Sequence, residues 1–234
     1  MTLSIIKGNI FNSDCQTIVN TVNCVGVMGA GIALECRLRY PEMYTKYISL
    51  CDSGMLAPGK LWLYKGLDRW ILNFPTKQHW RQPSYRSYLE KGLEKFALTF
   101  RAKEIRSIAF PLLGADKGGL NPEDSLGIMR RYLSDIPIQI EIYKYDPRAK
   151  DDKYDELKKV VSDYSEIEIA DKTGIKPQYV RKLMTAMNDD NIVQLNQLAR
   201  VRGIGIKTLE KIFGFMVGTD PSASVKNMEQ NKLL

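Results

Sequence analysis

The sequence NTVNCVGVMGAGIALECRLRYPEMY, residues 20–44, decides the fold prediction. An apolar strand over residues 17–22 runs directly into a glycine-rich loop, and a helical stretch over residues 32–40 follows. Glycines between a strand and a helix N-terminus let backbone N–H groups approach an anion closely. The amides of Asn20 and Asn23 at the mouth of the loop offer donors and an acceptor that suit sugar hydroxyls. This stretch therefore predicts a site for a nucleotide, which combines phosphate with sugar.

The composition of the chain favours an acidic partner. A formal charge of +7 over 234 residues points first to nucleic acid and then to a nucleotide, with general solubility as the simpler alternative. The four cysteines form no CxxC pair and His79 is the only histidine, so we expect reduced thiols and no metal. There is no apolar run of ~18 residues and no apolar signal-peptide core. We therefore expect a cytoplasmic protein with no membrane partner.

The first predicted domain, residues 1–147, alternates strand and helix patterns. Its predicted strands are residues 4–9, 17–22, 60–64, 69–75, 105–113 and 138–145. Helices are expected over residues 32–40, 41–54, 84–100 and 121–136, with Ser84 or Ser87 capping the third and Asn121 the fourth. Several strands are apolar throughout, as strands buried on both faces are. The pattern predicts an α/β fold, with a mixed sheet between helices on both faces.

Pro147 and the charged cluster after it mark a boundary, beyond which the pattern is almost entirely helical. Residues 148–216 form the second predicted domain, and residues 217–234 a mobile tail. Residues 165–187 have the shape of a helix-turn-helix, and residues 195–215 resemble a helix-hairpin-helix. Such hairpins can contact a DNA phosphate through glycine N–H groups and a lysine, whereas the alternative is a bundle for packing or dimerisation. The candidate nucleic-acid contacts are Lys176, Arg181, Lys182, Gly203, Gly205 and Lys207.

Four segments of the first domain are expected to belong together. Residues 7–11, 20–31, 74–80 and 110–120 each lie at the carboxyl end of a strand or in the loop after it. This is where α/β sheets bind their ligands. The fourth segment has the same pattern as the second, because in both of them glycines follow an apolar strand and precede a helix. Two such loops predict a cradle for a diphosphate.

Three motifs in this order resemble the macrodomain family, an ADP-ribose-binding fold. They are NTVNCVGVMGAGIAL at residues 20–34, FPTK at 74–77, and FPLLG followed by GGL within 110–120. The resemblance covers residues 1–146 and is strongest to the branch of the DarG-type DNA ADP-ribosyl glycohydrolases and the human terminal ADP-ribose glycohydrolase. It implies a three-layer α/β/α domain that hydrolyses a glycosidic bond and binds ADP-ribose without any cofactor.

The resemblance also implies roles for individual residues. Asn9 takes the place of an aspartate that contacts the adenine amino group, and its oxygen can accept the same hydrogen bond. Asn23 matches the asparagine at the distal ribose, and Lys77 matches the lysine that this branch uses in catalysis. Asn20 is expected to order the loop from behind. The expected ligand-binding residues are Asn9, Ile10, Asn20, Val27, Met28, Gly29, Ala30, Gly31, Thr76, Leu113, Gly114, Ala115, Asp116, Lys117, Gly118, Gly119 and Leu120.

Two departures from the family pattern bear on the substrate. Gly118 stands where the glutamate-specific human enzyme carries an acidic residue, and this glycine pattern is DarG-like. It implies that the substrate is mono-ADP-ribose linked to thymine in single-stranded DNA. The implied partners are ADP-ribosylated DNA, ADP-ribose and a DarT-like DNA ADP-ribosyltransferase that catalyses the opposing reaction. Asp116 stands where a small residue is common, so it must turn from the diphosphate or pair with Lys117. The alternatives are a reader without turnover, a hydrolase of glutamyl-linked ADP-ribose, and a DNA-binding regulator that senses nucleotide.

The residues after the FPTK strand carry the predicted chemistry. Breaking an N-glycosidic bond develops negative charge on the leaving base, so the site needs a donor there. Lys77 supplies a cation, or a nucleophilic amine if its pKa is lowered by burial, although a surface lysine that attracts phosphate is the simpler reading. We interpret His79 as a packing residue rather than a general base. Trp80 and Arg81 suit stacking with unpaired bases, unless Trp80 only covers the core.

Overall fold

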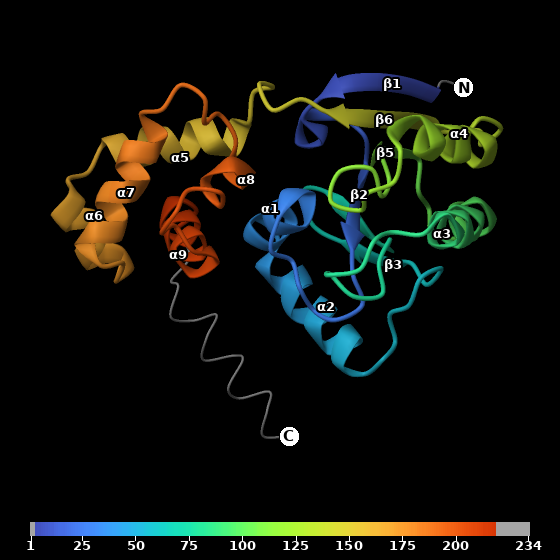
Figure 1. The fold of residues 1–234 in the computed structure, drawn as a ribbon, viewed down its shortest axis with the longest axis horizontal. Helices are drawn as coiled ribbons and strands as arrows, with labels where there is room; N and C mark the ends of the chain where they lie inside the picture. Colours follow the sequence, from blue (N-terminus) through green and yellow to red (C-terminus); the bar gives the residue numbers. More distant parts are fainter. Residues whose placement is uncertain (1–2, 219–234) are drawn as a thin grey trace. The chain divides into compact units, whose positions relative to one another are not determined.

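The chain forms two compact units (Figure 1). The computed structural model describes residues 3–218. The first unit ends at Asp146 and the second begins at Pro147, one residue before the boundary expected from the sequence. From residue 219 on, the expected tail lies outside the described residues.

A six-stranded sheet forms the centre of the first unit. Its strand order is β1-β6-β5-β2-β4-β3, and every neighbouring pair is parallel except β3 with β4. Because five strands run in one direction, the loops after them share one edge of the sheet. The strands are β1 (Leu3–Gly8), β2 (Thr17–Val22), β3 (Trp62–Lys65), β4 (Trp70–Pro75), β5 (Ser107–Pro111) and β6 (Gln139–Tyr145).

Helices cover both faces of this sheet (Figure 1). Ile18 and Val22 of β2 face a core shared with two helices, whereas Val19 faces the opposite core. This alternation is the period of two that a strand imposes on its side chains. The helices of the first core are α1 (Gly31–Arg39) and α2 (Pro41–Asp52), and those of the second are α3 (Arg86–Thr99) and α4 (Pro122–Leu133). The predicted three-layer α/β/α architecture with a mixed sheet is confirmed.

The starts of α3 and α4 are capped differently. The Asn121 side chain accepts from the backbone N–H groups of Glu123 and Asp124, as expected for the cap of α4. The expected serine cap of α3 is wrong, because Tyr85 occupies that position and makes no side-chain capping bond. Ser84 is buried instead, and its N–H donates to the Gly118 carbonyl at 2.9 Å. This segment therefore holds the second glycine loop rather than starting a helix.

The described part of the second unit, residues 147–218, is entirely helical apart from its connections. The helix α6 begins with a capping box between Ser165 and Glu168 and ends at Gly174, whose φ of 61° allows the sharp turn that follows. In the sequence, the charged cluster after Pro147 indicates only a domain boundary. In the structure, this cluster also contains the start of helix α5. No described helix is long and apolar enough to cross a membrane. The helices are α5 (Asp152–Ser162), α6 (Glu166–Thr173), α7 (Pro177–Met187), α8 (Leu195–Leu198) and α9 (Ile206–Met216).

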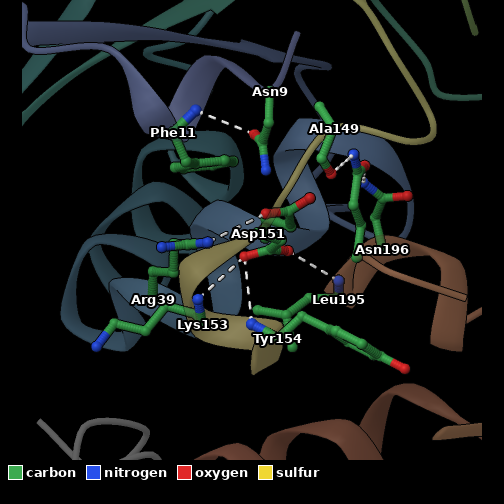
Figure 2. Close-up of polar contacts among 11 residues, drawn as sticks. Asn9, Phe11, Arg39, Ala149, Asp151, Lys153, Tyr154, Leu195 and Asn196 are labelled. Atoms are coloured by element: carbon green, nitrogen blue, oxygen red, sulfur yellow. Dashed lines mark hydrogen bonds and ion pairs between the residues drawn. The ribbon is translucent and has the colours of Figure 1, made fainter. Parts of the chain in front are cut away.

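A buried carboxylate, Asp151, joins two helix starts within the second unit (Figure 2). Its Oδ1 accepts from the backbone N–H groups of Lys153 and Tyr154, at 3.1 and 3.3 Å, in the first turn of α5. Its Oδ2 accepts from the Leu195 N–H at 2.9 Å, at the start of α8. A helix N-terminus carries partial positive charge, so a single carboxylate stabilises both starts.

Replacing Asp151 should therefore destabilise the second unit. Asp151→Ala removes a helix cap and leaves the buried Leu195 N–H without its acceptor, at a combined cost of about 2–4 kcal/mol. We expect amide hydrogen exchange in α5 and α8 to accelerate while exchange in the first unit stays unchanged. The exposed neighbour provides the control, since Asp152→Ala should cost less than about 1 kcal/mol. Equal effects of the two changes would contradict the bridging role.

Candidate functional site

Asn23 follows β2, and its side chain organises the first glycine loop. Its Oδ1 accepts hydrogen bonds from the backbone N–H groups of Val25 at 3.0 Å and Val27 at 3.3 Å, and its Nδ2 donates to the Val27 carbonyl. The Tyr47 hydroxyl of α2 lies 2.8 Å from the Asn23 carbonyl oxygen and 3.2 Å from Oδ1. Burial raises the pKa of Tyr47, so this hydroxyl remains a donor. The loop is closed on itself and tied to α2, and the amide has a second N–H for a ligand.

Asn20 lies behind this loop, inside the sheet. It is fully buried, and its Nδ2 donates to the Asn73 Oδ1 on β4 at 2.9 Å, with the Met28 sulfur 3.9 Å away. Its place among the ligand-binding residues is therefore corrected, whereas its position behind the loop is as expected. Met28 is also fully buried, so only its backbone can meet a ligand.

The first glycine loop ends at a helix start without a side-chain cap. Gly26 and Gly31 have φ values of 77° and 55°, a left-handed region that favours glycine. Ala30 occupies the cap position of α1, and its side chain makes no capping bond. The N–H groups of the first turn of α1 carry partial positive charge, the arrangement that binds phosphate.

The second glycine loop, residues 112–120, follows β5 and is shaped by close packing. Gly114 has a φ of 68°, and its carbonyl accepts from the Leu120 N–H at 3.0 Å. A Cβ atom on Gly118 would lie 2.2 Å from the Gly114 carbonyl oxygen and 2.5 Å from the Ser84 Oγ. No side chain fits at residue 118 in this loop, so an acidic side chain has no place there.

Asp116 and Lys117 form an exposed pair on the second loop. The Asp116 Oδ1 lies 3.9 Å from the Lys117 Nζ, and both side chains are more than half exposed. Of the two arrangements considered for Asp116, the structure has the pairing with Lys117. Water screens an exposed carboxylate, so its repulsion of a bound diphosphate is weak.

Lys77 lies two residues after β4 and connects the two glycine loops. Its ammonium donates to the Lys117 carbonyl in the second loop, and the next residue, Gln78, accepts from the Cys24 N–H of the first loop at 3.1 Å. Partial burial lowers the pKa of Lys77 below its usual range. Burial raises the pKa of the Cys24 thiol to about 11, so this thiol stays protonated. Of these two side chains, burial shifts only Lys77 toward its neutral, nucleophilic form.

Asn9 and Ile10 follow β1 at the same edge of the sheet. Asn9 caps the short 3₁₀ helix η1 (Ile10–Asn12), and its Oδ1 accepts from the Phe11 N–H at 3.1 Å (Figure 2). A carbonyl oxygen can accept two hydrogen bonds, so this contact is compatible with the expected one to adenine. Thr76, directly after β4, donates its N–H to the Val22 carbonyl at 3.0 Å and so aligns the ends of two strands.

The residues after Lys77 form an aromatic stack. The ring centroids of His79 and Trp80 lie 5.8 Å apart, and the Arg81 guanidinium lies 4.7 Å from the Trp80 ring. His79 Nδ1 accepts from the Arg81 N–H, which supports a packing role. Trp80 is 45% exposed, so part of its ring is open to solvent. Within residues 3–218, no three His, Cys, Asp or Glu side chains gather as a metal site requires.

The nucleic-acid candidates of the second unit differ in how they are engaged. Arg181 makes a two-pronged ion pair with Glu166, with Nε–Oε2 and Nη2–Oε1 distances of 2.9 and 3.0 Å. This pair neutralises its charge, so the structure disfavours Arg181 as a phosphate contact. The other candidates are exposed: Lys176, Lys182, Gly203, Gly205 and Lys207.

Sequence reasoning missed three residues that support the site. Asn73 is a polar residue inside an apolar strand, which is a visible signal of a buried hydrogen bond. Tyr47 gives no such signal, because aromatic residues are ordinary on the buried face of a helix. Ser84 resembles a helix cap, and only the position of the second loop shows its actual contact.

Comparison with known proteins identifies relatives of the first unit. A family model described as Macro domain matches residues 19–129. A DNA ADP-ribosyl glycohydrolase of Thermus aquaticus is 36% identical over 149 residues, covering 62% of this chain and 41% of that protein. A DNA ADP-ribosyl transferase-DNA ADP-ribosyl glycohydrolase fusion protein of Thermosipho africanus is 34% identical over 160 residues, or 60% of this chain and 41% of the fusion. The chain thus spans about two fifths of the length of these relatives.

Solved structures agree with this similarity. The macrodomain of Mycobacterium tuberculosis DarG matches with a TM-score of 0.59 and 40% identity, covering 61% of this chain and 97% of that one. Thermosipho africanus DarTG, in complex with ADP-ribose, matches with a TM-score of 0.58 and 33% identity, covering 62% of this chain and 41% of that one.

The packing of the second loop can be tested by adding a single methyl group. Gly118→Ala should lower the free energy of unfolding by roughly 1–3 kcal/mol, because its Cβ overlaps the Gly114 carbonyl oxygen. Gly127→Ala on α4 is the matched control, since a Cβ there meets nothing within 4 Å and alanine favours a helix. Urea unfolding followed by tryptophan fluorescence measures both. Undiminished stability in both variants would show that close packing does not shape this loop.

Proposed function

This chain belongs to the macrodomain family, and from that premise we propose that it hydrolyses ADP-ribose from DNA, specifically from thymine in single strands. The observation that carries the proposal is Lys77, whose ammonium contacts the second glycine loop beside the first. The similarity to proteins named DNA ADP-ribosyl glycohydrolase supports it. The opposing partner would be a DarT-like DNA ADP-ribosyltransferase, the activity that the name of the Thermosipho africanus fusion includes.

In this proposal the ligand lies along the edge of the sheet where the parallel strands end. The start of α1 and the second glycine loop hold the diphosphate through backbone N–H groups. The adenine amino group donates to Asn9, and a hydroxyl of the distal ribose accepts from the second N–H of Asn23. Recognition of the ADP-ribose thus depends mainly on the backbone and two asparagines.

The reaction breaks the bond between the anomeric carbon of the distal ribose and a nitrogen of the base. Water supplies a hydroxyl group to that carbon and a proton to the base nitrogen, so ADP-ribose and the unmodified base leave. Positive charge develops on the sugar and negative charge on the base as the bond breaks. Lys77 can stabilise the base as a cation. Alternatively, its neutral amine attacks the anomeric carbon and passes a proton to the base, and water then hydrolyses this adduct.

These two roles of Lys77 predict opposite pH profiles. Burial lowers the pKa of its ammonium, so the neutral amine forms at lower pH than in an exposed lysine. A cationic role requires kcat to fall as pH rises through this pKa, whereas a nucleophilic role requires it to rise. Lys77→Arg keeps a permanent cation and removes the nucleophile, so residual activity in this variant belongs to the cationic role.

The rival functions make different demands on the site. A reader binds ADP-ribose without turnover and has no need of a lysine with a lowered pKa at the junction of the loops. A hydrolase of glutamyl-linked ADP-ribose is disfavoured, since Gly118 leaves no room for the acidic residue of the glutamate-specific enzyme.

Lys77→Ala tests the proposed activity directly. We expect kcat on an oligonucleotide with thymine-linked ADP-ribose to fall by at least about 100-fold, while calorimetry gives a Kd for free ADP-ribose within a few-fold of wild type. Lys95→Ala is the control, because Lys95 is an exposed lysine on α3 and lies outside the candidate site. Binding without turnover in the wild type would indicate a reader. Full turnover in Lys77→Ala would exclude a catalytic Lys77.

The stack at Trp80 should position the DNA strand rather than the ADP-ribose. Loss of a base–aromatic stack costs about 1–3 kcal/mol per base, so Trp80→Ala should raise KM for a modified oligonucleotide roughly tenfold. Trp80→Phe should keep most of the affinity, and Leu98→Ala, at another exposed apolar residue, should have no effect. An equal rise in KM for ADP-ribosyl thymidine alone would place Trp80 at the nucleotide instead.

A further inference from the structure

The charges of the second unit, which lies outside the matched residues 19–129, are segregated along its sequence. Residues 151–171 carry eight acidic and three basic side chains. Residues 172–187 carry four basic and no acidic side chains, and residues 199–211 carry four basic side chains and one acidic, Glu210. Two aspartates, Asp189 and Asp190, lie between the two basic segments. Apart from them, residues 151–211 divide into an acidic region followed by two basic segments, whereas an even distribution would serve solubility alone.

The fold joins the two basic segments. The Lys211 ammonium of α9 donates to the Gly174 carbonyl in the turn between α6 and α7, at 2.8 Å. The Lys182 side chain of α7 lies against Gly203 in the connection between α8 and α9, so close that a Cβ on this glycine would be 2.7 Å from the Lys182 Nζ. The two basic segments are therefore in contact at two points. We call their cations without an acidic partner the basic face and define it as Lys176, Lys182, Arg200, Arg202, Lys207 and Lys211.

The charge of the basic face is not neutralised locally. Among residues 3–218, none of its six side chains has a carboxylate oxygen within 4.0 Å. Arg181 is close in sequence but differs, because Glu166 pairs with it. Five of the six side chains are exposed, and Lys211 is half-buried. The face thus presents unpaired cations to solvent.

The residues around the basic face favour a nucleic-acid partner over a protein partner. Stable protein interfaces have an apolar or aromatic centre. Within residues 147–218, the exposed large apolar side chains are those of Ile167 and Val217, and both lie outside residues 172–211. The α8–α9 connection also carries exposed glycines, where a phosphate can approach the backbone closely. Cations without an apolar anchor fit the regular negative charges of a phosphodiester backbone.

We propose that the basic face binds the phosphodiester backbone of nucleic acid, without reading base sequence. It holds the chain on DNA through phosphate contacts of the second unit. This inference is independent of the proposed hydrolysis, because it requires neither ADP-ribose nor Lys77.

The test uses the full chain, an unmodified fluorescent single-stranded oligonucleotide and anisotropy titrations over a range of NaCl concentrations. In one variant Lys182, Arg202 and Lys207 are all changed to glutamine, which keeps much of each aliphatic stem. Each lost phosphate contact on a single strand lowers the slope of log K against log salt by about 0.7, so we expect a slope about two units shallower. The affinity at low salt should fall roughly tenfold or more.

The matched control removes three charges from the acidic region of the same unit. Lys153, Lys158 and Lys159 of α5 are changed together to glutamine, which gives the same net charge. We expect its salt slope to remain that of wild type, and Arg181→Gln should behave likewise because Glu166 pairs with this residue. Equal losses in both triple variants would show that net charge alone binds DNA, and an unchanged slope in the first variant would also overturn the proposal.

Two further measurements keep the result interpretable. If the first triple variant melts at a lower temperature than wild type, the single changes Arg202→Gln and Lys207→Gln replace it, each with an expected slope change of about 0.7. Poly-glutamate of matched charge should compete at least tenfold more weakly than unlabelled DNA. Equal competition would assign the basic face to an acidic protein partner and overturn the nucleic-acid proposal.

Discussion

The geometry of the candidate site depends on one side-chain amide, that of Asn23. A side-chain amide offers one acceptor and two donors, so that of Asn23 accepts from the N–H groups of Val25 and Val27 and donates to the Val27 carbonyl at once. Without it, these backbone groups would need other partners, at about 1–3 kcal/mol for each one left buried and unpaired. The Tyr47 hydroxyl bonds the same residue, and the next N–H along the chain bonds Gln78. Because Lys77 immediately precedes Gln78, the position of its backbone follows from that of the loop.

The conformation of the second glycine loop is also fixed, but by the absence of a side chain rather than by the hydrogen bonds of one. In the first loop a side chain holds the backbone, whereas in the second the absence of one at Gly118 allows the backbone to close on Gly114 and Ser84. The same constraint affects the chemistry, because a loop that excludes every side chain at residue 118 also excludes an acid there. In the proposed function, packing and substrate preference are therefore linked at this residue. A change of specificity toward glutamyl-linked ADP-ribose would require a different loop conformation, beyond a single substitution.

Features that depend on local pattern were predictable from the sequence, and those that depend on distant contacts were not. The apolar runs predicted the six strands, and the glycines and Asn121 predicted the two loops and the start of α4. All of these features are determined by residues that are neighbours in the sequence. The expected serine cap of α3 failed because Ser84 serves a loop some thirty residues away. Asn20 meets Asn73 only through the pairing of β2 with β4. The Arg181–Glu166 pair likewise exists because the turn at Gly174 brings two helices together.

The two units would contribute to substrate binding by different physics. Contacts to a diphosphate at the glycine loops are short, directional hydrogen bonds in a partly buried site, where salt screens little. Contacts of exposed lysines to a phosphodiester backbone release counterions, so their contribution changes steeply with salt. Because both units belong to one chain, DNA held by the second is at raised local concentration for the first. Increasing salt should then raise KM for a long modified strand far more than for a modified nucleoside. In the proposed mechanism kcat depends on Lys77 and the loops, so it should stay nearly constant. If salt changes KM but not kcat, the chain binds DNA at one surface and cleaves the glycosidic bond at another. If a single surface did both, salt would change KM and kcat together.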